Sequence, residues 1–346
     1  ITRNLLKDDP KYSLDGIGAY HLTLGRNKKS VELDLKSEEG LKLFKELAEV
    51  ADVVVDNFSQ GVTKRLGIDH QSLKEVNPQI ITCSISGFGD TEVNRPAYDN
   101  LIQGYAGAMS ITGTDKDNPV KSGIPIADLG AGLYAVIGIL SAIQSREKND
   151  SGEHVDISML DTQVSLLTYM ATMHFLSGEN PEPIGNQHMN HVPFNSYRTL
   201  DGFIQIGVVA EDFWPSLIEA LDLRQLDTEE NRVRIGRLKN RENIDEALQE
   251  VFITNTTEHW LKILQEHRVP CGPINTLSET FEDADLLKRN MIVEVLQDSG
   301  TSVKMPGNPV KISNHDEEFR RSPKLGEHTA EIFKNWINKD ISVDQD

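Results

Sequence analysis

Apolar and polar positions in the first third of the chain follow two alternating periods. SEEGLKLFKELAE (37–49) has apolar residues at helical spacing behind an acidic first turn, and VADVVVDN (50–57) is a β-branched run typical of a strand. The pair repeats, with a short helix near 71–77 before the strand QIITCSIS (79–86). This alternation predicts a parallel sheet with helices on its faces.

The same texture continues to about residue 176. Helical patterns cover 97–110 and 128–146, a strand is expected at HVDISM (154–159), and one long apolar helix is expected from about 160 to 177. We therefore expect residues 1–176 to form a large α/β domain.

The pattern changes at SGENPEPIGNQHMNHVPFNS (177–196), where Gly, Pro and Asn replace periodic apolar residues and predict a linker. SYRTLDGFIQIGVV then predicts a β-hairpin that turns at Asp201-Gly202. A smaller α+β domain over 197–300 is expected from helical and strand patterns near 211–222, 242–253, 257–267 and 271–275. Residues 301–346 contain several prolines and are expected to return to the first domain.

Composition and charge narrow the class of protein. The 346 residues are 38% hydrophobic and 26% charged, which is ordinary for a soluble globular protein. The net charge is −19, of which residues 1–121 carry −3 and the remaining residues −16. So acidic a chain is a poor partner for nucleic acid or an anionic membrane, and any polyanionic ligand is expected to bind the N-terminal third.

Three further features of the sequence, namely its cysteines, histidines and apolar runs, indicate the cellular compartment of the protein and whether it binds a metal. Cys83 and Cys271 are far apart and outside any CxxC motif, which favours two reduced, packed thiols and a reducing compartment. No signal peptide opens the chain, and the apolar runs fall short of the ~18–20 residues of a spanning helix, so we expect a cytoplasmic protein, or a mitochondrial-matrix one in a eukaryote. His188 and His191 lie in a Pro/Asn-rich loop, where a polar loop is favoured over a metal site. We expect no metal and no tightly bound cofactor.

The usual nucleotide-binding motifs are missing from the sequence. It has no Walker A pattern and no GxGxxG between a strand and a helix, which disfavours a kinase or dehydrogenase. The N-terminal third does contain a set of basic residues, whose ordinary interpretation is solvated surface charge and whose alternative is phosphate binding. These residues are Arg26, Lys28, Lys29, Lys36, Lys64, Arg65, Arg95 and Lys121.

One aspartate stands out in SGIPIADLGAG (122–132). Composition favours Asp128 as a cap for a helix that starts near Leu129. The alternative is a nucleophilic carboxylate, held ionised at the positive end of that helix and approached by substrate across neighbouring glycines. These glycines are Gly123, Gly130 and Gly132.

RPAYDN contains a second candidate pair. Tyr98 and Asp99 are by default a core tyrosine and an acidic residue at the start of a helix. The functional alternative for Tyr98 is a phenol beside a reacting carbonyl.

The order of several motifs resembles the class III CoA transferases, the family of formyl-CoA and carnitine CoA transferases. The motifs span nearly the whole chain. They are LGRNKKSVELDLKSEEG, ADVVVDNFSQGVTKRLG, NPQIITCSISGFG, RPAYDN, SGIPIADLGAG, GEHVDISMLD and RSPKLGEHTAEI.

The resemblance implies a reaction and a nucleophile. In this family the aspartate of a G-x-x-x-x-D-x-x-x-G stretch attacks the acyl-CoA, and Asp128 occupies that position. CoA would move from an acyl-CoA donor to a carboxylic acid by way of aspartyl anhydride and aspartyl-CoA thioester intermediates. Water competes with the incoming acid and has to be kept out. The nearby glycines would offer N–H groups to the oxyanions.

The resemblance also implies a CoA site and an assembly. The phosphates of CoA give the basic residues a ligand, and Tyr98 is expected to hydrogen-bond the substrate carboxylate. The expected architecture is a large Rossmann-like domain plus a smaller α+β domain, in an interlocked homodimer. Residues expected to line the CoA site are Leu33, Asp34, Leu35, Lys36, Asn57, Phe58, Arg65 and Arg95.

The sequence departs from the family pattern twice. Family members begin with about forty more residues, which form a strand and a helix and supply part of the CoA site, and we expect that segment to precede Ile1. A glycine-rich loop of the oxalate-type members reads NQHMNHVPFNS (186–196) here. We therefore expect a dicarboxylate such as succinate rather than oxalate or formate.

Two other functions compete with the transferase. An α-methylacyl-CoA racemase shares the fold and pairs the same aspartate with a histidine, but that histidine would fall at Tyr98, and a phenol with a pKa near 10 is a poor base at neutral pH. A CoA-binding protein without turnover is the third interpretation. Exchange of an α-proton with solvent, without an added acid, would identify the racemase.

Overall fold

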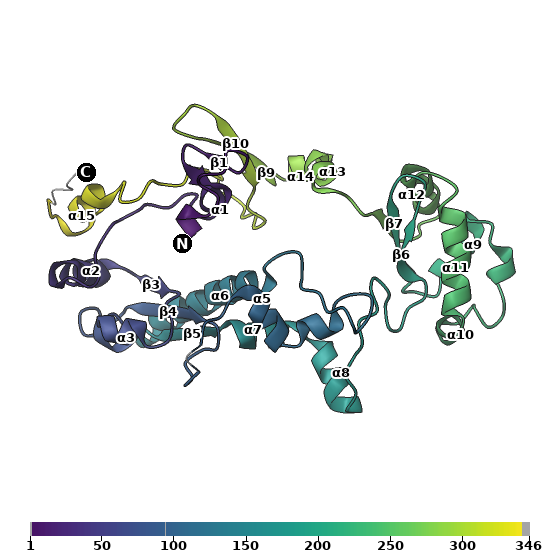
Figure 1. Cartoon of the computed structure of the whole chain (residues 1–346), viewed down its shortest axis with the longest axis horizontal. Helices are drawn as coiled ribbons and strands as arrows, with labels where there is room; N and C mark the ends of the chain where they lie inside the picture. Colours follow the sequence, from purple (N-terminus) through teal and green to yellow (C-terminus); the bar gives the residue numbers. More distant parts are fainter. Residues whose placement is uncertain (1, 94, 341–346) are drawn as a thin grey trace. The chain divides into compact units, whose positions relative to one another are not determined.

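A computed structural model describes residues 2–93 and 95–340 (Figure 1). The chain divides into two compact units. The first unit comprises Ile1–Pro96, Ala131–Ser158 and Leu277–Asp346, and the second unit comprises Ala97–Gly130 and Met159–Thr276. The protein is therefore a mixed α/β fold in which each unit is built from separate stretches of sequence.

The first unit contains the expected parallel sheet. Its strands are β3 (Val53–Asp56), β4 (Ile81–Ser86) and β5 (His154–Ser158), in the order β3-β4-β5 and all parallel. The central strand β4 is fully buried at Ile81 and Cys83. Thr82 between them is also buried, so both faces of this central strand are covered at its start.

Two of the helices next to this sheet, α2 and α4, lie close to where the sequence predicts them, whereas α3 was not expected. The helix α2 (Glu38–Val50) begins where the Ser37 side chain accepts a hydrogen bond from the Gly40 N–H. Two short helices follow β3, namely α3 (Val62–Leu66) and α4 (His70–Lys74). An apolar cluster stabilises this region by removing side chains from water, and its buried members are Ala48, Ile68, Leu73 and Ile80.

The two ends of the chain pack together in the first unit. A hairpin of β9 (Ile292–Leu296) and β10 (Ser302–Pro306) shares a small apolar cluster with Leu22, and Arg26 donates a 2.7 Å hydrogen bond to the Pro306 carbonyl. This hairpin was not expected from the sequence, and it straddles the expected start of the C-terminal segment at residue 301. The remaining elements here are η1 (Thr2–Asn4), β1 (Ser13–Leu14), β2 (Ile17–Gly18), α1 (Ala19–Leu24), α13 (Leu277–Glu282), α14 (Ala284–Lys288) and α15 (Thr329–Ile337).

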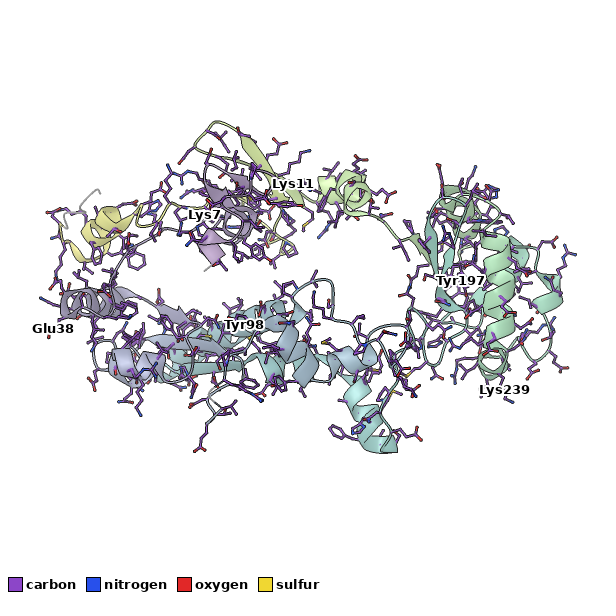
Figure 2. The ribbon with its side chains drawn as sticks, viewed as in Figure 1. Lys7, Lys11, Glu38, Tyr98, Tyr197 and Lys239 are labelled. Carbon is purple, nitrogen blue, oxygen red and sulfur yellow. The ribbon has the colours of Figure 1, made fainter. Side chains whose placement is uncertain are left out.

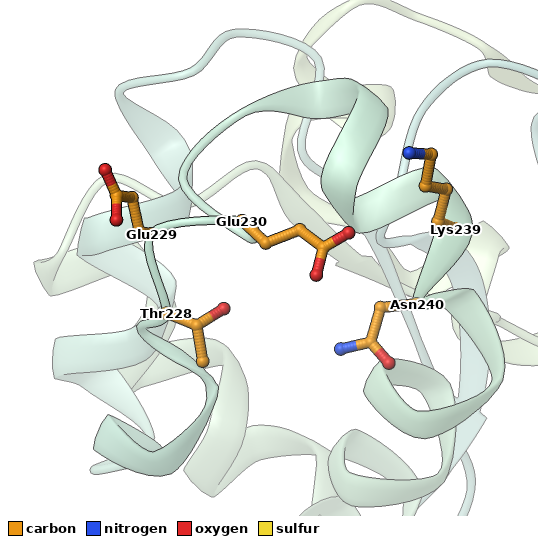
Figure 3. A pocket seen from close by; sticks show the side chains of 5 residues that line it. All are labelled: Thr228, Glu229, Glu230, Lys239 and Asn240. Atoms are coloured by element: carbon orange, nitrogen blue, oxygen red, sulfur yellow. The ribbon is translucent and has the colours of Figure 1, made fainter.

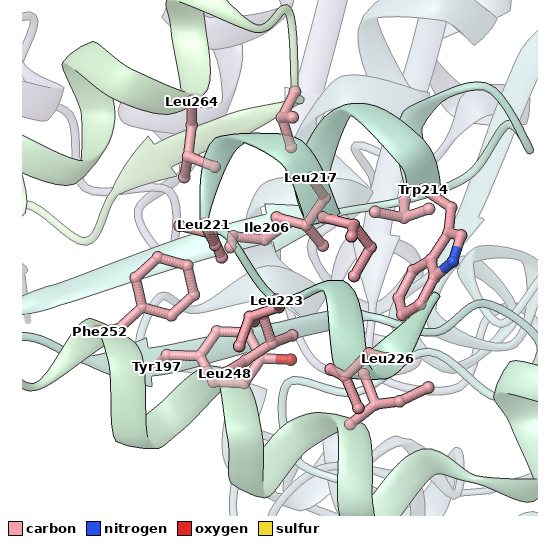
Figure 4. Packing of buried hydrophobic residues seen from close by; sticks show 14 of the residues in the cluster. Tyr197, Ile206, Trp214, Leu217, Leu221, Leu223, Leu226, Leu248, Phe252 and Leu264 are labelled. Carbon is pink, nitrogen blue, oxygen red and sulfur yellow. The ribbon is translucent and has the colours of Figure 1, made fainter. Parts of the chain in front are cut away.

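The second unit contains an antiparallel sheet with its own apolar core (Figure 4). The expected hairpin is confirmed, because β6 (Phe194–Arg198) and β7 (Phe203–Gly207) pair on either side of Asp201-Gly202. Strand β8 (Cys271–Pro273) pairs with β7. Around this sheet lie α9 (Phe213–Ala220), η3 (Arg224–Leu226), α10 (Arg234–Lys239), α11 (Arg241–Phe252) and α12 (Thr257–Glu266).

The expected single helix from about 160 to 177 is wrong. The segment forms α7 (Met159–Leu166) and α8 (Tyr169–Ser177), separated at Thr168, whose φ of 50° a continuing α-helix does not allow. Apolar composition alone did not reveal this break. The domain boundaries at 177–196 and 301 stay a prediction.

The longest helix, α6 (Ile126–Asn149), starts in the second unit and continues into the first. Its most apolar 18-residue window has a mean hydropathy of 1.9 and is 28% buried. By length and composition this helix is able to cross a membrane, so the expectation that no apolar run reaches that length is wrong. Most of its apolar surface has no cover within the described part of one chain.

Candidate active site

Asp128 is the third residue of α6, because the helix begins at Ile126 rather than near Leu129. The interpretation of Asp128 as a helix cap is therefore wrong. Its side chain is exposed, and no side chain among the described residues donates a hydrogen bond to its carboxylate oxygens. A free carboxylate at this place is available to a ligand.

The cap of α6 comes from another helix. Asp99 is the first residue of α5 (Asp99–Tyr105), as expected of an acid at a helix start, and its Oδ1 accepts hydrogen bonds from the N–H groups of Ala127 (2.8 Å) and Asp128 (3.4 Å). This second role of Asp99 was not expected from the sequence. The available signal was Pro125, which precedes the helix and has no side-chain acceptor for the free N–H groups of the first turn.

A buried amide completes this arrangement. Gln103, which is 1% exposed, donates from Nε2 to Asp99 Oδ2 at 2.6 Å and accepts at Oε1 from the Ser122 N–H at 2.9 Å. Asp99 and Gln103 therefore contact both ends of the segment that leads into α6.

The charge of Asp99 acts on its neighbour. The pKa of Asp128 is raised above its usual value, first by loss of hydration and then by repulsion from the Asp99 carboxylate. The sequence predicts that the positive end of α6 favours the ionised form of Asp128, which would lower its pKa. The net pKa shift in the structure has the opposite direction. A more basic carboxylate is a better nucleophile once it is ionised.

The three glycines around Asp128 have different surroundings. A Cβ on Gly130 would lie 3.0 Å from Thr162 Cγ2 and 3.1 Å from Leu166 Cδ1, so this glycine lets α6 pack closely against α7. Within the described residues, nothing lies within 4 Å of a Cβ placed on Gly123 or Gly132. Only these two glycines leave room for a substrate.

Tyr98 is not a core tyrosine. It occupies the N-cap position of α5, directly before Asp99, and is 65% exposed (Figure 2). Its phenol is accessible to a ligand, and its expected contact with the substrate carboxylate stays a prediction.

The residues expected to bind CoA belong to the first unit, whereas Tyr98 and Asp128 belong to the second. Leu33, Asp34, Leu35 and Lys36 lie before α2. The Asp34 carboxylate accepts a 3.0 Å hydrogen bond from the Lys36 N–H, and Leu35 packs against the apolar cluster below α2. Leu35 therefore has a structural role whether or not it lines a channel.

The other CoA candidates lie after the strands of the parallel sheet. Asn57 and Phe58 follow β3, and Asn57 donates a 2.6 Å hydrogen bond to the Ile85 carbonyl of β4. Arg65 is on α3, and the Arg95 guanidinium lies 4.5 Å from the centre of the Phe88 ring. The carboxyl ends of parallel strands are where open α/β sheets bind ligands.

Part of the basic set is already engaged. Lys29 pairs with Glu331, and Arg26 donates to Pro306 and stacks over Phe319. The C-terminal segment therefore neutralises the charge of Lys29 and holds the side chain of Arg26, two residues that the sequence analysis considered for phosphate binding.

A hollow of about 720 Å³ lies elsewhere in the second unit (Figure 3). It is lined by Thr228, Glu229, Glu230, Lys239 and Asn240, none of which was predicted as a site residue. Its two carboxylates outnumber its one lysine, which disfavours a polyanionic ligand. In the described ranges, no group of three or more His, Cys, Asp or Glu side chains is placed to hold a metal.

Comparison with known proteins defines the class. The chain belongs to CoA-transferase family III, whose family model matches residues 2–329. It is thus an enzyme that transfers CoA between an acyl-CoA and a carboxylate.

Particular relatives agree with this class. The chain is 32% identical over 325 residues to a human succinyl-CoA:glutarate CoA-transferase, covering 93% of this chain and 74% of the relative. It is also 32% identical over 342 residues to a succinyl-CoA:mesaconate CoA-transferase of Haloarcula hispanica, covering 95% and 86%. A CaiB/BaiF family crystal structure from Brucella suis is similar with a TM-score of 0.85 at 34% identity, covering 96% and 87%. The resemblance stated from the motifs is confirmed.

Proposed function

We propose that Asp128 is the nucleophile of CoA transfer. The observation that carries this proposal is an exposed carboxylate at the start of α6, without a side-chain partner in the described chain and with its own backbone N–H fixed by Asp99. Its raised pKa and the open space beside Gly123 and Gly132 support the same role.

The reaction exchanges one carboxylate for another on CoA. The Asp128 carboxylate attacks the donor thioester carbonyl, the C–S bond breaks, and a mixed anhydride and the CoA thiolate result. The thiolate attacks the aspartyl carbonyl of the anhydride, forms the aspartyl-CoA thioester and releases the donor acid. The incoming acid attacks that thioester and expels the thiolate, which then attacks the new acyl carbonyl and frees Asp128. Every intermediate keeps an activated acyl group, so no other energy source is required.

A dicarboxylate such as succinate is the proposed acid. Succinyl-CoA appears in the names of both curated relatives compared above. The exposed phenol of Tyr98 is the proposed hydrogen-bond donor to the substrate carboxylate.

The proposed CoA site uses the eight residues before α2 and after the strands of the parallel sheet. It belongs to a large Rossmann-like domain, accompanied by a smaller α+β domain. The free thiols of Cys83 and Cys271 support a reducing intracellular compartment. Burial raises the pKa of both thiols, that of Cys83 to about 11, which keeps them unreactive.

An interlocked homodimer is the proposed assembly, and α6 supports it. Leu133, Val136, Ile137 and Leu140 form one stripe at helical spacing, and each is at least 55% exposed in a single chain. Such a stripe on a helix marks a binding surface. A second copy is favoured over a lipid bilayer because the chain carries a charge of −19, and because the helix end is held to Asp52 through Arg146.

The dimer is tested by sedimentation of matched variants. Ile137→Lys places a charge in the stripe and should convert the dimer to monomer, whereas Gln144→Lys, on the polar end of the same helix, should leave the dimer intact. A monomeric wild-type protein, or one that binds neutral lipid vesicles through α6, would contradict the proposal.

The nucleophile is tested by kinetics with labelled acids. With succinyl-CoA and a panel of labelled dicarboxylates, Asp128→Asn should lower kcat by a factor on the order of 10³ or more, since a lost nucleophile removes the chemical step. Asp117→Asn, at an exposed loop position of the same unit, is the matched control and should keep full activity. Substantial transfer by Asp128→Asn would remove the mechanism.

A further inference from the structure

The segment Ser122–Asp128 is held at both ends by two side chains of α5. We propose that Asp99 and Gln103 are positioning residues of the transferase, which fix this segment and so hold the Asp128 carboxylate in the geometry for attack. The inference rests on the proposed role of Asp128 and adds the residues through which that role is set.

The two positioning residues are one helical turn apart on α5. Residues at positions i and i+4 face the same side of a helix, which lets the Gln103 amide reach the Asp99 carboxylate at 2.6 Å. Gln103 is 1% exposed, so its amide cannot exchange these partners for water. A buried polar group that loses its partner costs about 1–3 kcal/mol.

Each hydrogen bond between Ser122, Gln103, Asp99 and the start of α6 has a defined donor and a defined acceptor. The Ser122 N–H donates to Gln103 Oε1, Gln103 Nε2 donates to Asp99 Oδ2, and the remaining oxygen of Asp99 accepts from the start of α6. Every polar atom of the two side chains takes part in at least one of these hydrogen bonds. Reversing the Gln103 amide would place its NH2 group against the Ser122 N–H, so only one orientation satisfies all partners.

The position of these contacts explains why they matter for the reaction. They join the two ends of the segment that contains Gly123, where the chain leaves open space, and Asp128 itself. The same Asp99 charge also raises the pKa of Asp128. One carboxylate therefore both orients the nucleophile and increases its basicity, and a displacement of about 1 Å at a reacting group costs roughly 10²-fold in rate.

The test uses a pair of substitutions that exchange donor and acceptor. Asp99→Asn keeps the oxygen that caps α6 but turns an NH2 group toward the NH2 group of Gln103. Gln103→Glu alone places two carboxylates side by side. In the double variant, the side-chain amide at position 99 donates to the carboxylate at position 103. The second oxygen of that carboxylate accepts from the Ser122 N–H, so every hydrogen bond is restored.

We expect each single variant to lower kcat by roughly 10- to 100-fold with KM for succinyl-CoA changed less than about twofold, because attack geometry rather than CoA binding is affected. The double variant should recover most of the lost kcat. Unchanged kcat in both single variants, or a double variant no faster than the slower single one, would overturn the inference.

A second readout does not depend on the chemistry. In an Asp128→Asn background, amide exchange at Ser122 should become at least tenfold faster with Asp99→Asn and return toward the starting rate with both substitutions. Unchanged exchange would contradict the positioning role even where Asp128 is shown to be the nucleophile. Conversely, activity of Asp128→Asn itself would refute the proposed role of Asp128 as the nucleophile and would leave the exchange result unaffected.

If Asp99→Asn does not fold, a second variant is available. Asp99→Ser keeps a capping oxygen but is too short to reach Gln103, so it should give the same loss of protection at Ser122.

Discussion

The core around β6–β8 and the stretch from Ile124 to Leu140 use apolar residues in opposite ways. Trp214, Leu217 and Phe252 are fully buried within the second unit (Figure 4), whereas Ile124 is 55% exposed and Leu133 is 68% exposed. The first region is complete in one chain. The second contains the proposed nucleophile and leaves these apolar side chains exposed in a single chain. The comparison separates a region whose buried side chains stabilise one chain from the region in which we propose the chemistry to take place.

The largest stability effect should come from the complete core. Leu248 is fully buried in it, and Leu248→Ala should lower the free energy of unfolding by roughly 2–5 kcal/mol, because a cavity forms as apolar contact is lost. Leu277→Ala, at a position 74% exposed, should stay within about 0.5 kcal/mol. Denaturant titration followed by tryptophan fluorescence suits this test, because Trp214 and Trp260 both belong to the core.

Equal destabilisation by the two alanine variants would break the comparison. The third tryptophan, Trp336, lies on α15 and is 53% exposed, so a Trp336→Phe background removes its signal.

A smaller effect is expected where the C-terminal segment is held by charge. Arg321 donates to both carboxylate oxygens of Glu327, and this contact lowers the pKa of Glu327 to about 2. The folded pKa lies below the unfolded one, so the stabilisation is present above about pH 4.5 and is lost as pH falls toward 2. Glu327→Gln should therefore cost about 1–2 kcal/mol at pH 7 and close to nothing near pH 2.

Unfolding of the Glu327→Gln variant is followed across this pH range by circular dichroism. Glu250→Gln, at an exposed position on α11, is the matched control. A cost that does not change with pH would show that the ion pair is not its source.

The smallest effect should have the opposite sign. The pKa of Asp128 is raised in the fold, so its ionised form is disfavoured there and stability falls as pH rises through the folded pKa. Asp128→Asn should therefore increase the free energy of unfolding at pH 7 and leave it unchanged at pH 3. Thermal melts at the two pH values measure this difference. Destabilisation by Asp128→Asn at pH 7 would mean that the carboxylate serves the fold.

Local patterns predicted the strands of the parallel sheet and the hairpin of the second unit. The hairpin at Asp201-Gly202 and the helix capped by Ser37 are set by residues next to one another in sequence, and both are present. The motif around Asp128 likewise indicated the family, because the motif is a contiguous stretch of residues.

Long-range contacts were not predictable in this way. Asp99 caps a helix that begins 27 residues later, and neither residue type nor spacing shows that contact. The pairing of β9 with β10 depends on a cluster that includes Leu22, at the other end of the chain. The break at Thr168 depends on a backbone conformation that an apolar run does not encode.

Chemical trapping of the aspartyl thioester tests the central claim most directly. Trypsin should release residues 122–146 as one peptide, in which Asp128 is the only acidic side chain. After incubation with succinyl-CoA and hydroxylamine, mass spectrometry should find a hydroxamate on this peptide, and none without the acyl-CoA. An unmodified peptide from enzyme that is turning over donor in the presence of hydroxylamine would contradict covalent catalysis by Asp128.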